Sequence, residues 1–119
     1  MYNWSMPSTT KSFIEATMRA GLTYGFDANG GLIGLVNRQK ALFVTTRGGD
    51  TRPGAPFADM DALTAALRNA FAFIGVTDPQ FVDAQPTDFG TPEECAAALD
   101  RARAELAVIV EQWAPVAVS

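Results

Sequence analysis

The strongest strand signal in the sequence is Lys40-Ala41-Leu42-Phe43-Val44-Thr45-Thr46-Arg47-Gly48-Gly49. Residues 41–46 form a continuous apolar and β-branched run, which is typical of a strand covered by helices on both faces. The run ends in a Gly-Gly turn, and residues 50–58 are rich in Gly, Pro and Asp, which predicts a loop. The stretch therefore predicts a buried parallel strand whose carboxyl end opens into a loop.

Helical patterns flank this strand on both sides. Residues 8–20 follow Pro7, which suits the first position of a helix, and Gly21 stops the pattern. Residues 59–73 form a second pattern, which Asp59 can cap. The apolar residues on one face of these two patterns are Phe13, Ile14, Ala16 and Met18, then Leu63, Leu67, Ala70, Phe71 and Ile74.

A third helix is expected over residues 91–114. It opens with Thr91-Pro92-Glu93-Glu94, a capping box with proline in its first turn. Its predicted buried stripe consists of Leu99, Ala102, Leu106, Ile109, Val110 and Trp113. We interpret Asp59, Glu93 and Glu94 as residues that stabilise helix ends and not as catalytic acids or bases.

Two further strand signals complete the pattern. Residues 23–26 and 32–35 flank Asn29-Gly30, which takes the positive backbone dihedrals of a tight hairpin turn. Residues 80–84 form another short strand. The order helix, hairpin, strand, helix, strand, helix predicts an α/β fold with parallel strands joined by crossover helices.

Composition excludes several classes of function. The 119 residues make one small domain, and a net charge of −4 without a Lys/Arg cluster argues against a nucleic-acid surface. The apolar runs are too short to span a bilayer, and no signal peptide is evident. The single Cys95 allows no internal disulfide, so we expect a cytoplasmic protein. The chain has no histidine, which removes Ser-His and Cys-His nucleophile systems and the usual zinc sites, so we expect no metal site.

Five short motifs together resemble one enzyme family. They are Met-Tyr-Asn-Trp-x-x-Pro-Ser at residues 1–8, Arg-Ala-Gly-Leu-Thr-Tyr at 19–24, Asn-Gly at 29–30, the stretch at 40–49, and Phe-Ile-Gly-Val-Thr-Asp at 73–78. In this order and spacing the chain resembles the FMN-dependent NADH-azoreductases, also called NADH:quinone oxidoreductases. The likeness covers essentially all 119 residues and is strongest over 1–49 and 71–90.

The resemblance implies a flavodoxin-like, three-layer α/β/α fold with a parallel sheet and FMN at its topological switch point. It also implies homodimers with both active sites at the subunit interface. Such an enzyme takes two electrons from NAD(P)H through the flavin to a quinone or azo acceptor. No side chain has to act as a catalytic acid or base, because the cofactor carries the chemistry.

The resemblance assigns site residues to two loops. Met1, Tyr2, Asn3 and Trp4 match a loop along the isoalloxazine ring. Thr46, Arg47, Gly48 and Gly49 match a second loop that holds the ring through backbone N–H groups, with glycine where the main chain comes close to the ligand. Phe26 and Phe73 correspond to aromatic positions around the substrate pocket.

Full-length members of that family begin with a strand, a serine-rich phosphate loop, a helix and two further strands, all of which would precede Met1. We therefore expect residues 1–119 to be the C-terminal part of a single flavodoxin-like domain without its N-terminal strands and phosphate loop. Pro7-Ser8-Thr9-Thr10 opens a helix with hydroxyls, but the resemblance places it beside the ring. A second hypothesis is a non-catalytic fragment that cannot hold FMN and needs a partner chain to fold, because one strand edge would stay open.

Overall fold

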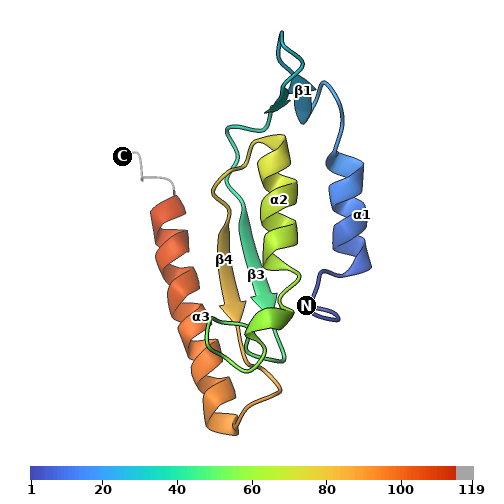
Figure 1. Ribbon diagram of the computed structural model, residues 1–119. Helices are drawn as coiled ribbons and strands as arrows, with labels where there is room; N and C mark the ends of the chain where they lie inside the picture. Colours follow the sequence, from blue (N-terminus) through green and yellow to red (C-terminus); the bar gives the residue numbers. More distant parts are fainter. Residues whose placement is uncertain (115–119) are drawn as a thin grey trace, which may run out of the picture.

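The computed structural model describes residues 1–114 and shows a parallel strand pair between helices (Figure 1). Figure 1 shows α3 on one side of β3 and β4, with α2 and α1 on the other side. The hairpin β1–β2 stands at the end of the molecule away from the carboxyl ends of β3 and β4. The elements are α1 (Ser8–Thr17), β1 (Tyr24–Phe26), β2 (Leu32–Gly34), β3 (Leu42–Thr46), the 3₁₀ turn Ala58–Met60, α2 (Thr64–Ile74), β4 (Gln80–Ala84) and α3 (Pro92–Trp113).

The predicted parallel pairing is confirmed, because β3 and β4 run parallel with Phe43 opposite Phe81 and Thr45 opposite Asp83. Side chains alternate between the two faces of a strand, so these residues share the face toward α2. The rings of Phe43 and Phe81 lie 5.2 Å apart. Val82 points to the other face and is fully buried there, where α3 packs on β4.

The main hydrophobic core lies between the sheet and the two helices α1 and α2. Its buried members are Ile14 from α1 with Leu63 and Leu67 from the start of α2. Phe43 and Phe81 from the sheet pack against them. At about 25 cal/mol per Å² of apolar surface, this burial is the main force that holds α1 against the sheet.

The hairpin forms where it is expected, but with a different turn. The expected Asn-Gly turn needs a positive φ at both Asn29 and Gly30, whereas the structure has one at Gly30 and not at Asn29, within the loop between the paired residues Phe26 and Leu32. The Asp27 carboxylate accepts hydrogen bonds from the N–H groups of Asn29 and Gly31. Asp27 therefore organises this loop, and only Gly30 within it has a positive φ, of 79°.

The expected helix α1 is three residues too long, since it ends at Thr17 and not at Ala20. The Thr23 hydroxyl donates to the carbonyl oxygen of Thr17 at 2.7 Å, and Met18 already has an extended backbone. The side chain of Thr23, which lies beyond the helix, thus forms a hydrogen bond with the carbonyl oxygen of the last helical residue. Phe13, which we expected in the apolar stripe, is 62% exposed.

The other two helices also depart from expectation in detail. Helix α2 begins at Thr64, because the carboxylate of Asp61, and not that of Asp59, accepts from the main-chain N–H groups of Leu63 and Thr64. Helix α3 has the expected capping box. Its predicted stripe is wrong at Leu99 and Val110, which are 41% and 55% exposed. The stripe is narrower than expected because the helix packs on a single strand, β4.

The outer edge of β3 borders a groove. Its volume is about 440 Å³, and it runs between the strand and the helices α1 and α2. Val44 on this strand is 59% exposed, although the sequence predicts a strand covered on both faces. No helix within residues 1–114 combines the length and the apolar character needed to cross a membrane.

Candidate functional site

A crevice of about 320 Å³ lies at the carboxyl ends of β3 and β4. Ligands of open α/β sheets bind at this edge, outside the carboxyl ends of the strands. The crevice brings together the N-terminal loop, the turn after β3 and the loop after β4. Its lining residues are Met1, Asn3, Trp4, Gly48, Gly49, Asp88 and Phe89.

The first wall is a tight turn over residues 2–5. The N–H of Tyr2 donates to the carbonyl oxygen of Ser5, and the N–H of Ser5 donates to that of Tyr2. The two central residues, Asn3 and Trp4, have positive φ values of 47° and 65°, as in a type I′ turn. A left-handed backbone is unusual for tryptophan and carries strain, which tends to persist where a site requires a particular loop shape.

Trp4 contacts the long loop between β3 and α2. Its carbonyl oxygen accepts from the N–H of Ala62, and its ring lies 5.0 Å from the ring of Phe57. A Cβ on Gly49 would come within 2.6 Å of Phe57 and 2.9 Å of Trp4. The packing of these two rings therefore requires glycine at position 49.

The second wall is the turn after β3. Loop residues after β4 donate to its carbonyl oxygens: Thr87 to that of Arg47, and both Asp88 and Phe89 to that of Gly48. The main-chain N–H groups of Gly48 and Gly49 have no acceptor among residues 1–114. A Cβ on Gly48 would lie 3.1 Å from the Asp88 carboxylate, so glycine keeps the floor of the crevice open.

The crevice fits the polar edge of a flat ring system. The Asn3 side chain is exposed, and the two glycine N–H groups of the opposite wall have no acceptor among residues 1–114. The aromatic side chains of Trp4 and Phe89 contribute flat apolar surface beside them. A few polar groups beside flat apolar side chains are the usual arrangement for orienting a small ligand.

Behind the turn, the guanidinium of Arg47 is completely buried. Its Nη1 lies 2.8 Å from the Asp61 carboxylate, and its Nη2 lies 3.3 Å from that of Asp83. The hydroxyls of Thr45, Thr51 and Thr64 accept its remaining hydrogen bonds. Because the charge is fully paired, the fold tolerates it in a dry position.

The pKa of Asp61 reflects this environment. Burial raises the pKa of the carboxyl, but hydrogen bonds from the side chain and main chain of Thr64, from Arg47 and from the N–H of Leu63 outweigh it. The net effect lowers the pKa of Asp61 to about 2. Asp61 is therefore ionised over the whole physiological range, and it caps α2 and pairs with Arg47 at the same time.

Several expected site residues lie elsewhere. The N–H of Arg47 donates to the carbonyl oxygen of Ala84 and its side chain is buried, so neither can reach a ligand in the crevice. Thr46 borders the groove along β3, where its carbonyl oxygen accepts from the Met1 nitrogen at 3.0 Å. Tyr2 is 68% exposed and faces a neighbouring hollow at the start of α1, with Ser8.

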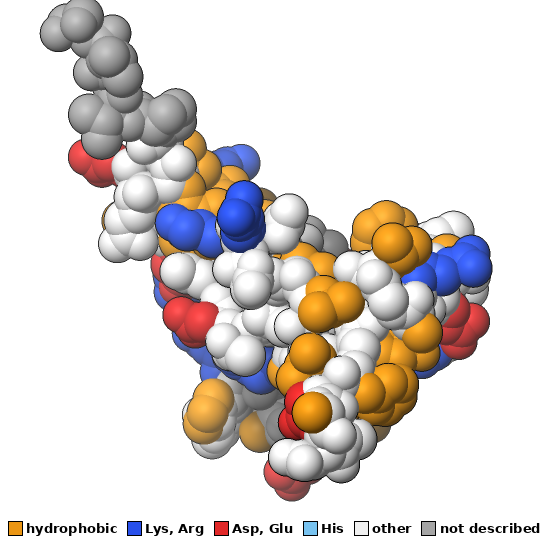
Figure 2. Space-filling view, turned by 90° about the horizontal axis from the view of Figure 1, so that it is seen from above, with side chains coloured by type: hydrophobic (Ala, Val, Ile, Leu, Met, Phe, Trp, Pro, Cys, Tyr) orange, Lys and Arg blue, Asp and Glu red, His pale blue; other side chains and the backbone are white. Residues whose placement is uncertain are grey.

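Phe26 and Phe73 are not at the crevice. Both lie with Tyr24 at the hairpin end, where the rings of Tyr24 and Phe73 are 4.9 Å apart. Figure 1 places this end opposite the carboxyl ends of the strands. Figure 2 looks onto this end and shows hydrophobic side chains at its surface. The exposed apolar residues there are Leu22, Phe26, Leu32, Ile33, Leu35 and Phe73.

Sequence reasoning missed three residues at the crevice. Asp88 and Phe89 line it directly, and Phe57 supports Trp4 from behind. The position of Asp88 and Phe89 just after β4 was an available signal, because the carboxyl ends of neighbouring parallel strands meet at one edge of the sheet. No local pattern marks Phe57, which reaches Trp4 only through the long loop after β3.

Comparisons with known proteins agree with the resemblance seen in the sequence. A family model described as "Flavodoxin-like fold" matches residues 1–109. An FMN-dependent NADH:quinone oxidoreductase of Nostoc punctiforme is 38% identical over 113 residues, which cover 95% of this chain and 54% of the relative. An enzyme of the same name from a second Nostoc is 43% identical over 91 residues, which cover 76% of this chain and 44% of the relative.

A solved structure is similar as well. The FMN-dependent NADH-azoreductase of Bacillus anthracis, in complex with FMN, has a TM-score of 0.83 and 25% identity over 97% of this chain and 53% of its own. The predicted flavodoxin-like α/β fold is thereby confirmed. The chain spans about half the length of the curated relatives it matches.

Replacing Arg47 should destabilise the protein strongly. Arg47→Met leaves Asp61 and Asp83 without their shared cation, and breaking such a pair costs about 3–5 kcal/mol. The control is Arg52→Met, which breaks an exposed pair with Asp50 and should cost less than about 1 kcal/mol. Urea denaturation measures both changes. Equal losses in the two variants would contradict a special role for the buried guanidinium.

Stability should fall as the pH drops from about 4 toward 2. The carboxyl of Asp61 has a pKa of about 2 in the fold against 3.8 as its ordinary value, so its stabilisation is complete above the higher value and is lost below the lower one. The shift corresponds to about 2.4 kcal/mol at 1.36 kcal/mol per pKa unit, and solvent screening of this partly exposed carboxyl reduces the contribution to on the order of 1–2 kcal/mol. Thermal melts over this range should show a flatter pH dependence for Asp61→Asn. An unchanged profile would exclude Asp61 as the titrating group.

Proposed function

Because the chain belongs to the flavodoxin-like fold family, where its curated relatives are FMN-dependent NADH:quinone oxidoreductases, we propose that it binds FMN and takes part in NADH-dependent reduction of quinone or azo acceptors. One observation carries this proposal. The turn around Asn3 and the turn around Gly48 face the same crevice at the carboxyl ends of parallel strands. Both turns are the ones that the family resemblance assigns to the flavin ring.

In this proposal the chain holds and orients the ring. Asn3 and the N–H groups of Gly48 and Gly49 donate to its polar atoms, while Trp4 and Phe89 cover its apolar surface and exclude water. FMN, when bound, supplies a carrier that takes two electrons from NAD(P)H and passes them to the acceptor. The protein needs no histidine for this, which suits a chain that contains none. Its lone Cys95 suits a reducing cytoplasm.

We propose further that two copies form the complete active site. Phe26 and Phe73 match substrate-pocket positions but lie beside Tyr24 at the hairpin end, which Figure 1 shows opposite the carboxyl ends of β3 and β4. They can join a pocket over the ring only if they come from a second copy. The exposed apolar hairpin surface supports such an interface, because an apolar patch of this kind marks contact sites.

One observation favours a second candidate function. The outer edge of β3 borders an open groove, and Val44 beside it is largely exposed. An unpaired strand edge is a template for pairing with another chain. The alternative is therefore a non-catalytic flavodoxin-like chain that docks through β3 and does not itself hold FMN. A flavin titration separates the two candidates.

The FMN proposal predicts a specific effect of Asn3. Glycine adopts the positive φ of this position without strain, so Asn3→Gly keeps the turn and removes only the carboxamide. Loss of its hydrogen bonds should weaken FMN binding about tenfold. Quenching of FMN fluorescence measures the affinity, and NADH should bleach the flavin absorption of the loaded protein.

The matched control is Asn29→Gly, in the remote hairpin loop, where only the main-chain N–H is used. This variant should bind FMN like the unaltered protein. Absence of FMN binding by the unaltered protein at tens of micromolar would remove the flavoenzyme proposal for this chain.

The two-copy proposal predicts complementation. Asn3→Gly damages the crevice and Phe26→Ala damages the hairpin surface, so a mixed dimer keeps one undamaged site. After random reassortment of the two variants, roughly a quarter of all sites should be intact. NADH-dependent decolourisation of an azo dye measures recovery, with each variant alone as control. If the mixture is no more active than its components, each site is built from one copy.

A further inference from the structure

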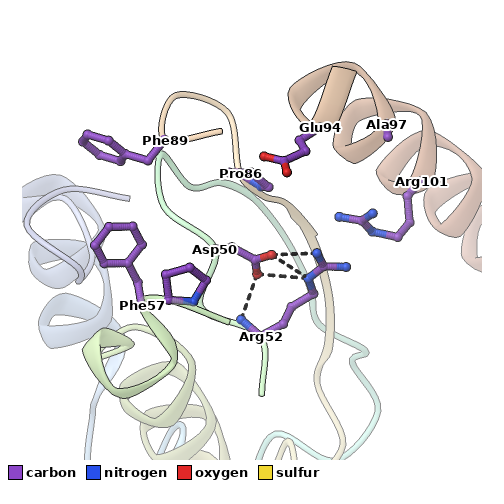
Figure 3. A pocket seen from close by; sticks show the side chains of 9 residues that line it. Asp50, Arg52, Phe57, Pro86, Phe89, Glu94, Ala97 and Arg101 are labelled. Carbon is purple, nitrogen blue, oxygen red and sulfur yellow. Dashed lines mark hydrogen bonds and ion pairs between the residues drawn. The ribbon is translucent and has the colours of Figure 1, made fainter. Parts of the chain in front are cut away.

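A second hollow lies beside the crevice, and the function proposed above leaves it without a role. Its volume is about 280 Å³, and it is enclosed by the loop after β3, the loop after β4 and the first turns of α3 (Figure 3). Its lining residues are Asp50, Arg52, Pro56, Phe57, Pro86, Phe89, Glu94, Ala97 and Arg101. It therefore also opens at the carboxyl ends of the strands, where ligands of α/β folds bind.

Two arginines enter this hollow, and they differ in how fully they are used. Arg52 is held by Asp50, to which its Nε and Nη2 both donate. This pairing lowers the pKa of Asp50, so its carboxylate stays ionised and stays paired with Arg52. Arg101 is half-buried and uses only Nη2, which donates at 2.8 Å to the carbonyl oxygen of Gln85. Its Nε and Nη1 have no acceptor among residues 1–114.

The two carboxylates of the hollow are engaged already. Asp50 is neutralised by Arg52, and the carboxylate of Glu94 accepts from the N–H of Thr91 in the capping box. The positive end of the α3 helix dipole lies beside Glu94 and offsets part of its charge. Arg101 is thus the group in the hollow that can still accept an anionic partner in the plane of its guanidinium.

The rest of the lining is flat and apolar. Phe57 and Phe89 lie 5.7 Å apart, and Pro56 and Pro86 complete the wall. Phe89 is 65% exposed although it is aromatic. The volume is near the lower end of about 300–1,000 Å³ that is usual for small-molecule sites, so the hollow suits one flat ring with an attached anion.

Phe89 is also a wall of the crevice, and Phe57 contacts Trp4 on the crevice side. A ligand that passes Phe89 would touch both spaces. Such a ligand must carry a redox-active ring at one end, and at the other end a flat ring with an attached anion. A quinone carries no anion and would leave Arg101 unused, whereas a nicotinamide dinucleotide has both parts.

We propose that this second hollow binds the adenosine-phosphate end of the dinucleotide donor, an assignment that rests on the proposed function for the identity of the ligand. A phosphate of the donor pairs with Arg101, with Arg52 at the rim. The adenine ring lies against Phe57 and Phe89, as flat bases stack on aromatic side chains. The nicotinamide end then points past Phe89 toward the flavin ring that the crevice is proposed to hold.

The test uses AMP on the full chain without flavin, with adenosine and inorganic phosphate as separate probes in isothermal titration calorimetry. AMP should bind at least tenfold more tightly than either probe. Arg101→Gln should reduce AMP affinity at least tenfold and leave adenosine affinity unchanged, which a general structural defect would not do. The control Arg103→Gln removes an exposed arginine of the same helix, paired with Asp100, and should change nothing.

A second variant tests the aromatic wall. Phe89→Ala truncates an exposed ring and should weaken both AMP and adenosine severalfold, with phosphate unaffected. NADH should displace AMP. The inference is overturned if AMP does not bind, if phosphate binds as tightly as AMP, or if Arg101→Gln and Arg103→Gln behave alike. FMN binding without AMP binding overturns this inference alone, and AMP binding without FMN binding overturns only the proposed flavin function.

Discussion

The buried guanidinium of Arg47 organises the edge of the sheet at the carboxyl ends of β3 and β4. A charged group without solvent contact persists only if every donor finds an acceptor. Here the acceptors come from four places in the chain: Thr45 on β3, Thr51 in the loop after it, Asp61 and Thr64 at the start of α2, and Asp83 on β4. Satisfying one side chain therefore fixes the relative position of all four segments. The turn that carries Gly48 is held in place as a consequence.

This network sets geometry more than it adds stability. A buried ion pair gains little net free energy over well-packed apolar side chains, because both charges lose their hydration. Its value lies in specificity. The hydrogen-bond network extends beyond Arg47. The hydroxyl of Thr51 donates to the side-chain oxygen of Gln85, and the main-chain carbonyl oxygen of Gln85 accepts from Arg101. The crevice and the second hollow are thus connected by one hydrogen-bond network.

The sequence predicted those parts of the fold that local patterns determine. Strand β4, the limits of α3 and its capping box follow from apolar runs and from Thr91 and Glu94, and the structure has them as expected. The errors arise where a side chain from another segment decides. Thr23 ends α1 early, Asp27 reshapes the hairpin loop, and Asp61 replaces Asp59 as the cap of α2. The pattern of a single helix or turn contains no information about such partners.

The same limit explains the site. The family resemblance assigned Asn3 and Gly48 to one ligand, and the structure brings them to one crevice. The sequence could not show that the side chain of Arg47 is buried, because an arginine directly after a strand can equally well be exposed and contact a ligand. Gly49 was interpreted as a site of ligand approach, and the structure adds a packing reason for glycine there, because a Cβ would meet Phe57 and Trp4. The same residue type can serve a buried packing role or bind a ligand at the surface, and the sequence does not tell the two roles apart. For Arg47, the positions of Asp61 and Asp83 in the structure show that it is buried.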